Sequence, residues 1–199
     1  MSTPVITYNR GMSRWEPNAR SRLEQAALEL YRERGFDQTT VAEIAARAGL
    51  TERTFFRYFA DKREVLFGGQ GALQEIYVSA IASAPESAAP IDAVAAALEA
   101  VAPMFRERHA FARQRQTVIA ANPGLQEREL QKRAALASAM ADALRRRGVA
   151  EPAASLAAEV GAITFGTAFA RWVSEPDAQD LSALIRESLD QLKLITAGK

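Results

Sequence analysis

The sequence predicts an all-α fold of about nine helices, with a small N-terminal domain followed by a larger C-terminal helical bundle. Apolar residues recur every three or four positions along most of the 199 residues, which is the period of a helix with one buried face. No stretch has the two-residue alternation of a β-strand. Glycines and prolines divide the chain into segments of helical length. We expect domains at 17–66 and 67–199, preceded by a flexible arm at 1–16.

Composition excludes several classes of function. The chain has no cysteine and one histidine, which excludes a disulfide scaffold and a cysteine nucleophile and argues against a metal centre. We therefore expect no cofactor and no enzyme activity. No apolar run approaches the roughly 18 residues of a membrane span, and the polar start is unlike a signal peptide. These features predict a cytoplasmic protein without a membrane partner.

The arm is basic. Residues 1–22 contain four arginines (Arg10, Arg14, Arg20 and Arg22) and a single acidic residue, Glu16, which is a net charge of 4 − 1 = +3. Such a segment is either a solvated N-terminus or an arm that contacts a polyanion, and by itself it favours the first interpretation.

The N-terminal domain contains clear helix-start and helix-stop signals. The first helix has one apolar stripe, formed by Leu23, Ala26, Ala27, Leu30 and Tyr31. Gly35 is placed to end it. Thr40 and Glu43 have the spacing of a capping box, and the helix that they begin ends at Gly49. Thr51 is placed to cap a further short helix. Asp61 and Glu64 repeat the cap signal.

Residues 40–59 therefore form two helices joined by a tight turn, which is the order of a helix-turn-helix motif. In that motif the second helix enters the major groove of DNA. Its outward side chains include Arg53 and Arg57, and arginine makes two hydrogen bonds to guanine. Phe55 and Phe59 are expected in the core, whereas Phe56 fits the core or the surface.

Residues 22–66 resemble the DNA-binding domain of the tetracycline-repressor (TetR) family. The resemblance runs through Gly35–Phe36, Thr39–Val41, Ile44–Ala45, Ala48–Gly49, Thr54–Phe59 and Lys62. It implies an all-α protein whose first three helices read DNA and whose C-terminal bundle binds a small-molecule effector and forms a homodimer. It implies DNA contacts for Thr40, Thr51, Glu52, Arg53, Thr54, Phe56, Arg57, Tyr58 and Lys62. Thr40 and Lys62 would contact phosphate, and Lys62 would begin the fourth helix.

The sequence departs from the family pattern at two positions. The family usually has Tyr where this chain has Phe56, and His where it has Tyr58. Phe56 has no hydroxyl to donate to phosphate, and Tyr58 offers one two residues later.

The bundle is rich in alanine. We expect helices at 91–108 (kinked at Pro103), 110–121 and 152–174, a long helix that ends at Gly148, and a last helix after Pro176. Gly68, Gly69 and Gly71 interrupt the expected fourth helix. They predict either a helix break or a hinge that couples ligand binding to the spacing of two DNA-reading domains.

The last two helices are predicted to form the dimer interface. The penultimate helix has a face of small residues: Ala154, Ala157, Ala158, Gly161, Ala162 and Gly166. The last helix has a leucine-rich face: Leu181, Leu184, Ile185, Leu189, Leu192 and Ile195. The alternative is that both faces form the core of a single chain. We favour the dimer, because it would bind a pseudo-palindromic operator with half-sites about 34–36 Å apart.

A ligand pocket is expected between about residues 73 and 172. Its candidate lining residues are Met104, Phe105, His109, Phe111, Phe165, Phe169 and Trp172. Phe165, Phe169 and Trp172 lie on one helical stripe, which is also typical of ordinary core, and His109 also fits a surface position at a helix end. Residues 113–125 and Trp172 resemble TetR members of the mycofactocin-regulator type. That resemblance implies an acyl-CoA-like effector whose anionic head contacts Arg113 or Arg115.

Together these features predict a ligand-responsive transcriptional regulator, a repressor that a small apolar effector releases from its operator. Two alternatives stay open. One is a DNA-binding helical protein without an effector, whose bundle would be filled. The other is an all-α lipid carrier with an accidental helix-turn-helix.

Overall fold

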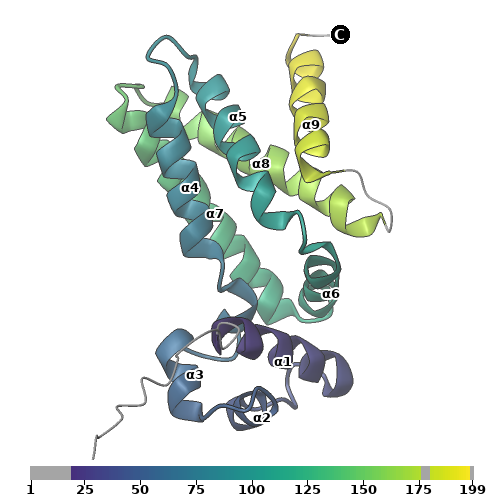
Figure 1. The fold of residues 1–199 in the computed structure, drawn as a ribbon. Helices are drawn as coiled ribbons and strands as arrows, with labels where there is room; N and C mark the ends of the chain where they lie inside the picture. The colour runs from purple at the N-terminus through teal and green to yellow at the C-terminus, as the bar shows by residue number, and fades with distance from the viewer. Residues whose placement is uncertain (1–18, 176–179, 198–199) are drawn as a thin grey trace, which may run out of the picture.

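The computed structural model describes residues 19–175 and 180–197, and within them it has nine α-helices, two short 3-10 helices and no strand. The all-α class is therefore confirmed (Figure 1). The arm expected at 1–16 lies outside the described residues. A small N-terminal unit, called the head below, lies at one end of a larger bundle (Figure 1). The domain boundary expected between residues 66 and 67 stays a prediction.

The head consists of α1 (Ala19–Arg34), α2 (Val41–Arg47), α3 (Glu52–Tyr58) and the 3-10 helix η1 (Glu64–Phe67). The predicted capping box is present, because Thr40 Oγ1 accepts from the Glu43 amide and Glu43 accepts from the Thr40 amide. Gly35 and Gly49 have φ of +86° and +65°, the left-handed conformation that ends a helix. Phe55 and Phe59 are buried, as expected.

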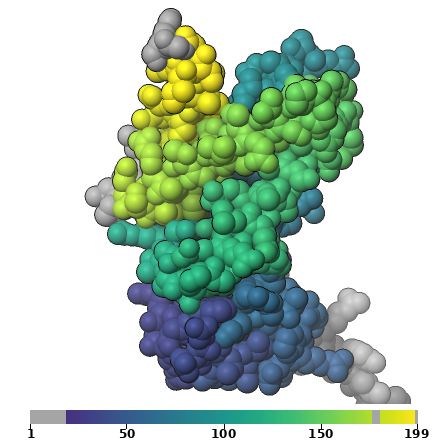
Figure 2. Space-filling view, turned by 180° about the vertical axis from the view of Figure 1, so that it is seen from behind, coloured from purple at the N-terminus to yellow at the C-terminus, as the bar shows by residue number. Residues whose placement is uncertain are grey.

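Six further helices and a second 3-10 helix make up the rest of the described fold: α4 (Gln70–Ser83), α5 (Pro90–Val101), η2 (Ala102–Phe105), α6 (His109–Ala120), α7 (Pro123–Arg146), α8 (Ala153–Ser174) and α9 (Leu181–Thr196). α6 lies between the head and the bundle (Figures 1 and 2). Val118 and Ile119 of α6 and Leu125 of α7 are buried in the apolar cluster of the head. The two units therefore share part of one core.

Two expected helices are shorter than the sequence indicated. The fourth helix does not begin at Lys62. The chain forms η1, passes through Gly68 and Gly69, and begins α4 at Gln70. The structure thus has the helix break, and the hinge stays a hypothesis. The helix expected at 91–108 becomes 3-10 after Val101, because Pro103 has no N–H for an α-helical bond.

The small-residue face of α8 packs within the chain instead of facing outward. Ala154, Ala158, Gly161 and Ala162 are buried, and Gly161 lies directly against Val94 of α5. The leucine-rich face of α9 is also mostly buried, although Ile195 is 74% exposed. The single-chain core, the alternative considered for these faces, is therefore what the structure shows for most of them.

α8 also corrects the expectation about membrane spans. Among the described helices it alone is long and apolar enough to cross a membrane by length and composition, with a mean hydropathy of 1.3 over 18 residues. A core helix passes the same test. α8 packs against α5, α7 and α9, although only 39% of that 18-residue window is buried.

Candidate nucleic-acid interface and ligand pocket

α3 presents its polar residues to solvent. Glu52 and Arg53 are exposed, and neither side chain has a hydrogen bond or ion pair within residues 19–175 and 180–197. The Arg57 guanidinium lies 5.0 Å from the centre of the Tyr58 ring, and its Nη2 donates to Tyr58 Oη at 3.3 Å. Tyr58 therefore orients Arg57. These side chains form a face suited to polar contacts with bases and phosphates.

Phe56 lies on the same exposed surface, with 54% of the residue accessible. Its ring meets Phe55 edge-on, with centroids 5.4 Å apart. An exposed phenyl ring has no polar group to offer, so a contact to DNA at this position would be apolar, such as one to a thymine methyl group.

Two of the three threonines of the predicted site, Thr40 and Thr51, are helix caps, and the third, Thr54, is the partner of Thr51. Thr51 Oγ1 accepts from the Thr54 amide at 3.2 Å and lies 3.1 Å from Thr54 Oγ1. Thr40 Oγ1 donates to Glu43 Oε2 at 2.9 Å. The hydroxyls thus have intramolecular partners, and their first role is to fix where α2 and α3 begin.

Lys62 differs most from its expected role. Its ammonium donates to the carbonyl oxygens of Phe36 (2.9 Å), Asp37 (3.1 Å) and Thr39 (2.9 Å). An ammonium has three donors, so all of them are used. The Lys62 carbonyl accepts from Tyr31 Oη at 2.5 Å. The structure therefore has Lys62 as a clamp on the loop between α1 and α2, and its contact with phosphate stays a prediction.

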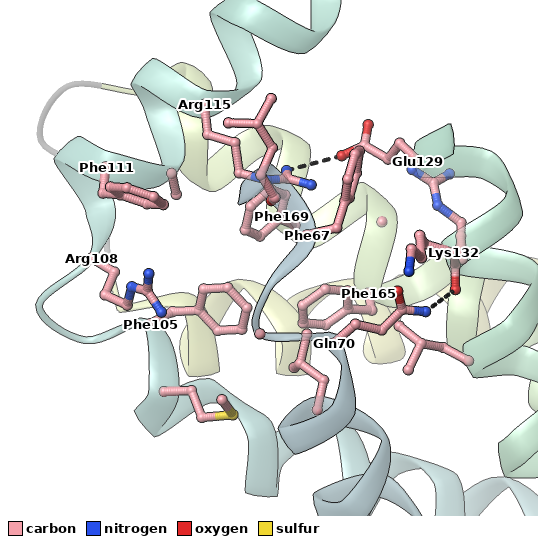
Figure 3. A pocket seen from close by; sticks show the side chains of 18 residues that line it. Phe67, Gln70, Phe105, Arg108, Phe111, Arg115, Glu129, Lys132, Phe165 and Phe169 are labelled. Atoms are coloured by element: carbon pink, nitrogen blue, oxygen red, sulfur yellow. Dashed lines mark hydrogen bonds and ion pairs between the residues drawn. The ribbon is translucent and has the colours of Figure 1, made fainter. Parts of the chain in front are cut away.

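A cavity of about 190 Å³ lies where η1, α4, η2, α6, α7 and α8 meet (Figure 3). Six of the predicted lining residues line it: Met104, Phe105, Phe111, Arg115, Phe165 and Phe169. Trp172 does not. It is buried against Phe105 and Phe169, with ring centroids 5.9 and 5.7 Å apart.

His109 and Arg113 are also outside the cavity wall. His109 Nε2 lies 2.8 Å from the Trp172 carbonyl oxygen, which ties α6 to α8. Arg113 is exposed. In the described parts of the chain, no three His, Asp or Glu side chains are grouped so as to hold a metal ion.

Two parts of the cavity wall were not predicted from the sequence: the part formed by η1 and most of its charged residues. Leu66 and Phe67, which belong to the apolar cluster of the head, form part of the wall. Arg108, Glu129, Lys132 and Arg133 add charge, and Figure 3 shows Arg108 and Lys132 on opposite sides of the central aromatic rings. These residues come from separate elements, so no spacing in the sequence brings them together.

The wall is strongly cationic, with Arg108, Arg115, Lys132 and Arg133 against Glu129 alone. Arg115 is deeply placed. Its Nε donates to the Leu66 carbonyl at 2.6 Å, and its Nη1 lies 3.0 Å from Glu129 Oε1. Burial lowers the pKa of Arg115, and the Glu129 carboxylate opposes that shift. The cavity is thus apolar in its centre and positive at its edges.

Comparisons with known proteins agree with this architecture. Residues 24–67 match the model of bacterial regulatory proteins of the tetR family, and residues 88–195 match the MftR C-terminal domain. The transcriptional regulator TcmR of Streptomyces glaucescens is 36% identical over 88 residues, which are 44% of this chain and 39% of TcmR. The chain thus matches less than half the length of that relative.

Two solved structures show the same fold at low identity. The transcriptional regulator FadR of Bacillus subtilis, solved in complex with stearoyl-CoA, has a TM-score of 0.60 and 21% identity, over 86% of this chain and 96% of FadR. A TetR-family regulator of Syntrophomonas wolfei has a TM-score of 0.59 and 16% identity, over 90% of this chain and 95% of that one. With a helix-turn-helix head, a ligand-binding type of C-terminal domain and family models matched over both, the chain belongs to the tetR family of bacterial transcriptional regulators.

Proposed function

We propose that the protein is a ligand-responsive repressor rather than an enzyme. In this proposal a cytoplasmic homodimer binds a pseudo-palindromic DNA operator through α3, and a small effector that fills the cavity releases it. One observation carries the proposal: Leu66 and Phe67 of η1 line the cavity, and η1 belongs to the same head that presents Glu52 and Arg53. A ligand in the cavity would touch the core of the DNA-reading head directly.

The chemistry of the wall supports an effector with an apolar chain and an anionic head, of the acyl-CoA class. Phe105, Phe165 and Phe169 offer apolar surface, and the four cations favour a negative group. The stearoyl-CoA bound by the B. subtilis neighbour is a ligand of that chemistry. The cavity of about 190 Å³ is below the usual range of about 300–1,000 Å³ for ligand sites. Such an effector would therefore have to move the walls.

For the dimer, the exposed apolar residues of the last two helices support an interface. Leu156 and Ile163 of α8 are 62% and 64% exposed, and they lie seven residues apart on one face. Leu194 and Ile195 of α9 are also exposed. Exposed leucines and isoleucines on adjacent helices are typical of a surface that a second copy covers.

DNA selection tests the proposal. The protein is incubated with fragments of its own genome, the retained fragments are sequenced, and their affinity is measured by gel shift at several salt concentrations. Arg53→Ala should lower the affinity for the selected fragment by about 5- to 150-fold, the usual value of one specific base contact. The matched control Arg106→Ala removes an exposed arginine of the bundle and should leave the affinity unchanged.

If no fragment is retained at low salt, the protein is not a DNA-binding regulator. The effector is tested with dodecanoyl-CoA, which should lower the affinity of the wild-type protein for the selected fragment. Unchanged DNA affinity at saturating dodecanoyl-CoA would favour a helical DNA-binding protein without this class of effector.

A further inference from the structure

Three of the four cations that line the cavity also hold the head. Arg108 Nη2 lies 3.2 Å from Glu24 Oε2 of α1. Arg115 Nε donates to the Leu66 carbonyl of η1 at 2.6 Å, and Lys132 Nζ lies 2.9 Å from Glu64 Oε2 of η1. We call these contacts the three tethers.

The fourth cation, Arg133, is in a different state. Among the described residues its guanidinium has neither an ion pair nor a hydrogen bond; Arg133 is exposed to solvent, and its guanidinium lies close to Gly166 on the cavity wall. The wall therefore contains one unpaired cation beside three that are shared with the head. Arg133 directly follows Lys132 in the sequence, and both residues line the cavity. An anion that binds Arg133 would therefore also be close to Lys132.

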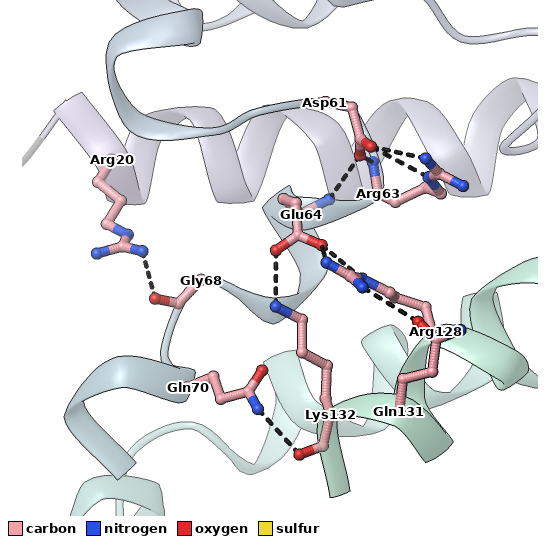
Figure 4. A network of polar contacts seen from close by, with 9 residues as sticks. All are labelled: Arg20, Asp61, Arg63, Glu64, Gly68, Gln70, Arg128, Gln131 and Lys132. Carbon is pink, nitrogen blue, oxygen red and sulfur yellow. Dashed lines mark hydrogen bonds and ion pairs between the residues drawn. The ribbon is translucent and has the colours of Figure 1, made fainter. Parts of the chain in front are cut away.

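The Glu64 tether has two cations on one carboxylate. Figure 4 shows the Glu64 carboxylate between two cations of α7. Arg128 Nε donates to Glu64 Oε1 at 2.7 Å, and Lys132 Nζ binds the other oxygen. The Lys132 backbone carbonyl also accepts from Gln70 Nε2 at 2.9 Å, which joins the start of α4 to the same point. Burial acts to raise the pKa of Glu64, but the hydrogen bonds from Lys132 and Arg128 hold the pKa below its usual range.

We propose that an anionic effector and the DNA-reading head compete for the same cations. The acidic group of the effector binds Arg133 and Lys132, draws Lys132 away from Glu64, and so loosens η1 and the head from α7. Arg108 and its partner Glu24 respond in the same way on the opposite side of the cavity. This inference rests on the proposed function and adds the physical route by which the effector acts.

Competition has a consequence that can be measured away from the cavity. Coupling between two sites is reciprocal, so whatever weakens the hold of the head on Lys132 must strengthen the binding of the anion. Glu64 does not line the cavity and therefore does not touch the effector. A change in effector affinity after substitution of Glu64 would thus report competition for the cation rather than a lost contact.

The experiment uses the full chain and two probes of equal chain length, anionic dodecanoyl-CoA and neutral 1-dodecanol, with affinities measured by calorimetry. Glu64→Gln should bind dodecanoyl-CoA at least about fivefold more tightly, the lower end of usual coupling, and 1-dodecanol as the wild type does. Arg128→Gln should do the opposite. It leaves Lys132 as the one remaining cation on Glu64, so dodecanoyl-CoA should bind more weakly.

Glu151→Gln is the matched control. Glu151 pairs with Arg145, and neither residue lines the cavity, so both affinities should stay at their wild-type values. If dodecanoyl-CoA binds wild type and Glu64→Gln equally, or binds Arg128→Gln as tightly as wild type, the competition is overturned while the proposed function stands. If Glu64→Gln does not fold, Arg128→Gln decides alone. Failure of wild type to bind dodecanoyl-CoA at all would overturn the proposed effector class, and the competition with it.

Discussion

The head and the bundle hold their helices together by different means. α2 and α3 have seven residues each, which is too short for a helix to be stable alone. The head therefore relies on side chains that bond to backbone. Lys62 joins three carbonyls, Tyr31 Oη donates to the Lys62 carbonyl, and Thr39 Oγ1 donates to the Gly35 carbonyl at 2.8 Å.

The bundle relies on close packing along long helices. α7 and α8 have 24 and 22 residues, and small side chains let them approach their neighbours. Gly161 against Val94 is the tightest such contact among the glycines of the described residues. The bundle also has one polar clamp of this kind: the Arg147 guanidinium donates to the carbonyls of Ile81 (2.9 Å), Ala84 (2.6 Å) and Pro85 (2.6 Å), at the end of α4 and just after it. Arg147 apart, we expect single polar substitutions to destabilise mainly the head and single changes of side-chain volume to destabilise mainly the bundle.

The largest effect is expected for Lys62→Met, which keeps the aliphatic stem and removes the ammonium. Three carbonyl oxygens lose their shared donor, and hydrogen bonds to a charged group contribute about 1.5–3 kcal/mol each before non-additivity. We expect a loss of about 3 kcal/mol in the free energy of unfolding, measured by urea denaturation. Arg63→Met is the matched control. Its pair with Asp61 is exposed and screened by solvent, so this variant should keep close to wild-type stability.

Lys62→Met also separates the two roles of this residue. If the variant keeps its full stability and loses affinity for DNA, Lys62 is the phosphate contact that the family resemblance implies. If stability falls as expected, the clamp is its main role.

In the bundle the corresponding substitution is Gly161→Ala. A Cβ at this position would overlap Val94 Cγ1, so α5 and α8 would have to separate. Overpacking of this kind costs about 1–3 kcal/mol. Gly166→Ala on the same helix is the control, because its Cβ would meet Arg133 at an ordinary 3.5 Å. It should raise stability by about 0.5–1 kcal/mol, since alanine is the better helix former. Equal thermal midpoints for the two variants would contradict this account.

The same contrast explains what could be predicted from the sequence. Helix periods, the Thr40 and Thr51 caps and the glycine stops at 35 and 49 are local signals, and the structure has all of them. Of the cavity wall, a helical stripe predicts Phe165 and Phe169, the place in the bundle predicts Met104, Phe105 and Phe111, and the family resemblance implies Arg115. The bonds of Lys62 and the cations shared across the cavity depend on which distant backbone groups come near, and no spacing in the sequence records that.

The glycines at 68, 69 and 71 allow a smaller test at the junction between the two regions. A Cβ on Gly68 would lie 2.7 Å from Glu24 Oε1 and 3.0 Å from Phe59 Cε1, whereas on Gly69 or Gly71 it would meet nothing within 4 Å. Gly68→Ala should therefore cost about 1–2 kcal/mol of stability. Gly69→Ala and Gly71→Ala should be neutral or slightly stabilising in urea denaturation.

Two of these variants, Gly69→Ala and Gly71→Ala, also test the hinge hypothesis. A break that is needed only for packing predicts a normal response of DNA affinity to dodecanoyl-CoA in Gly69→Ala and Gly71→Ala. Loss of that response in either variant, with stability unchanged, would establish the hinge.

The smallest effect is expected in the pH dependence of stability that the two ionic tethers cause. The pKa values of their carboxyl groups shift in opposite directions. For Glu64 the folded pKa is lowered, so its contribution is full above about pH 4.3, the usual pKa, and is lost as the pH falls through the folded pKa. For Glu24, burial raises the pKa despite Arg108 and Arg20, so its contribution is full below the usual pKa and is lost as the pH rises through the folded pKa. Urea denaturation between about pH 3 and 7 should therefore show less acid destabilisation in Glu64→Gln than in wild type, and more in Glu24→Gln. If both variants changed the acid destabilisation in the same direction, the same balance of burial and charge would act on both carboxylates, and the contrast between the two tethers would be wrong.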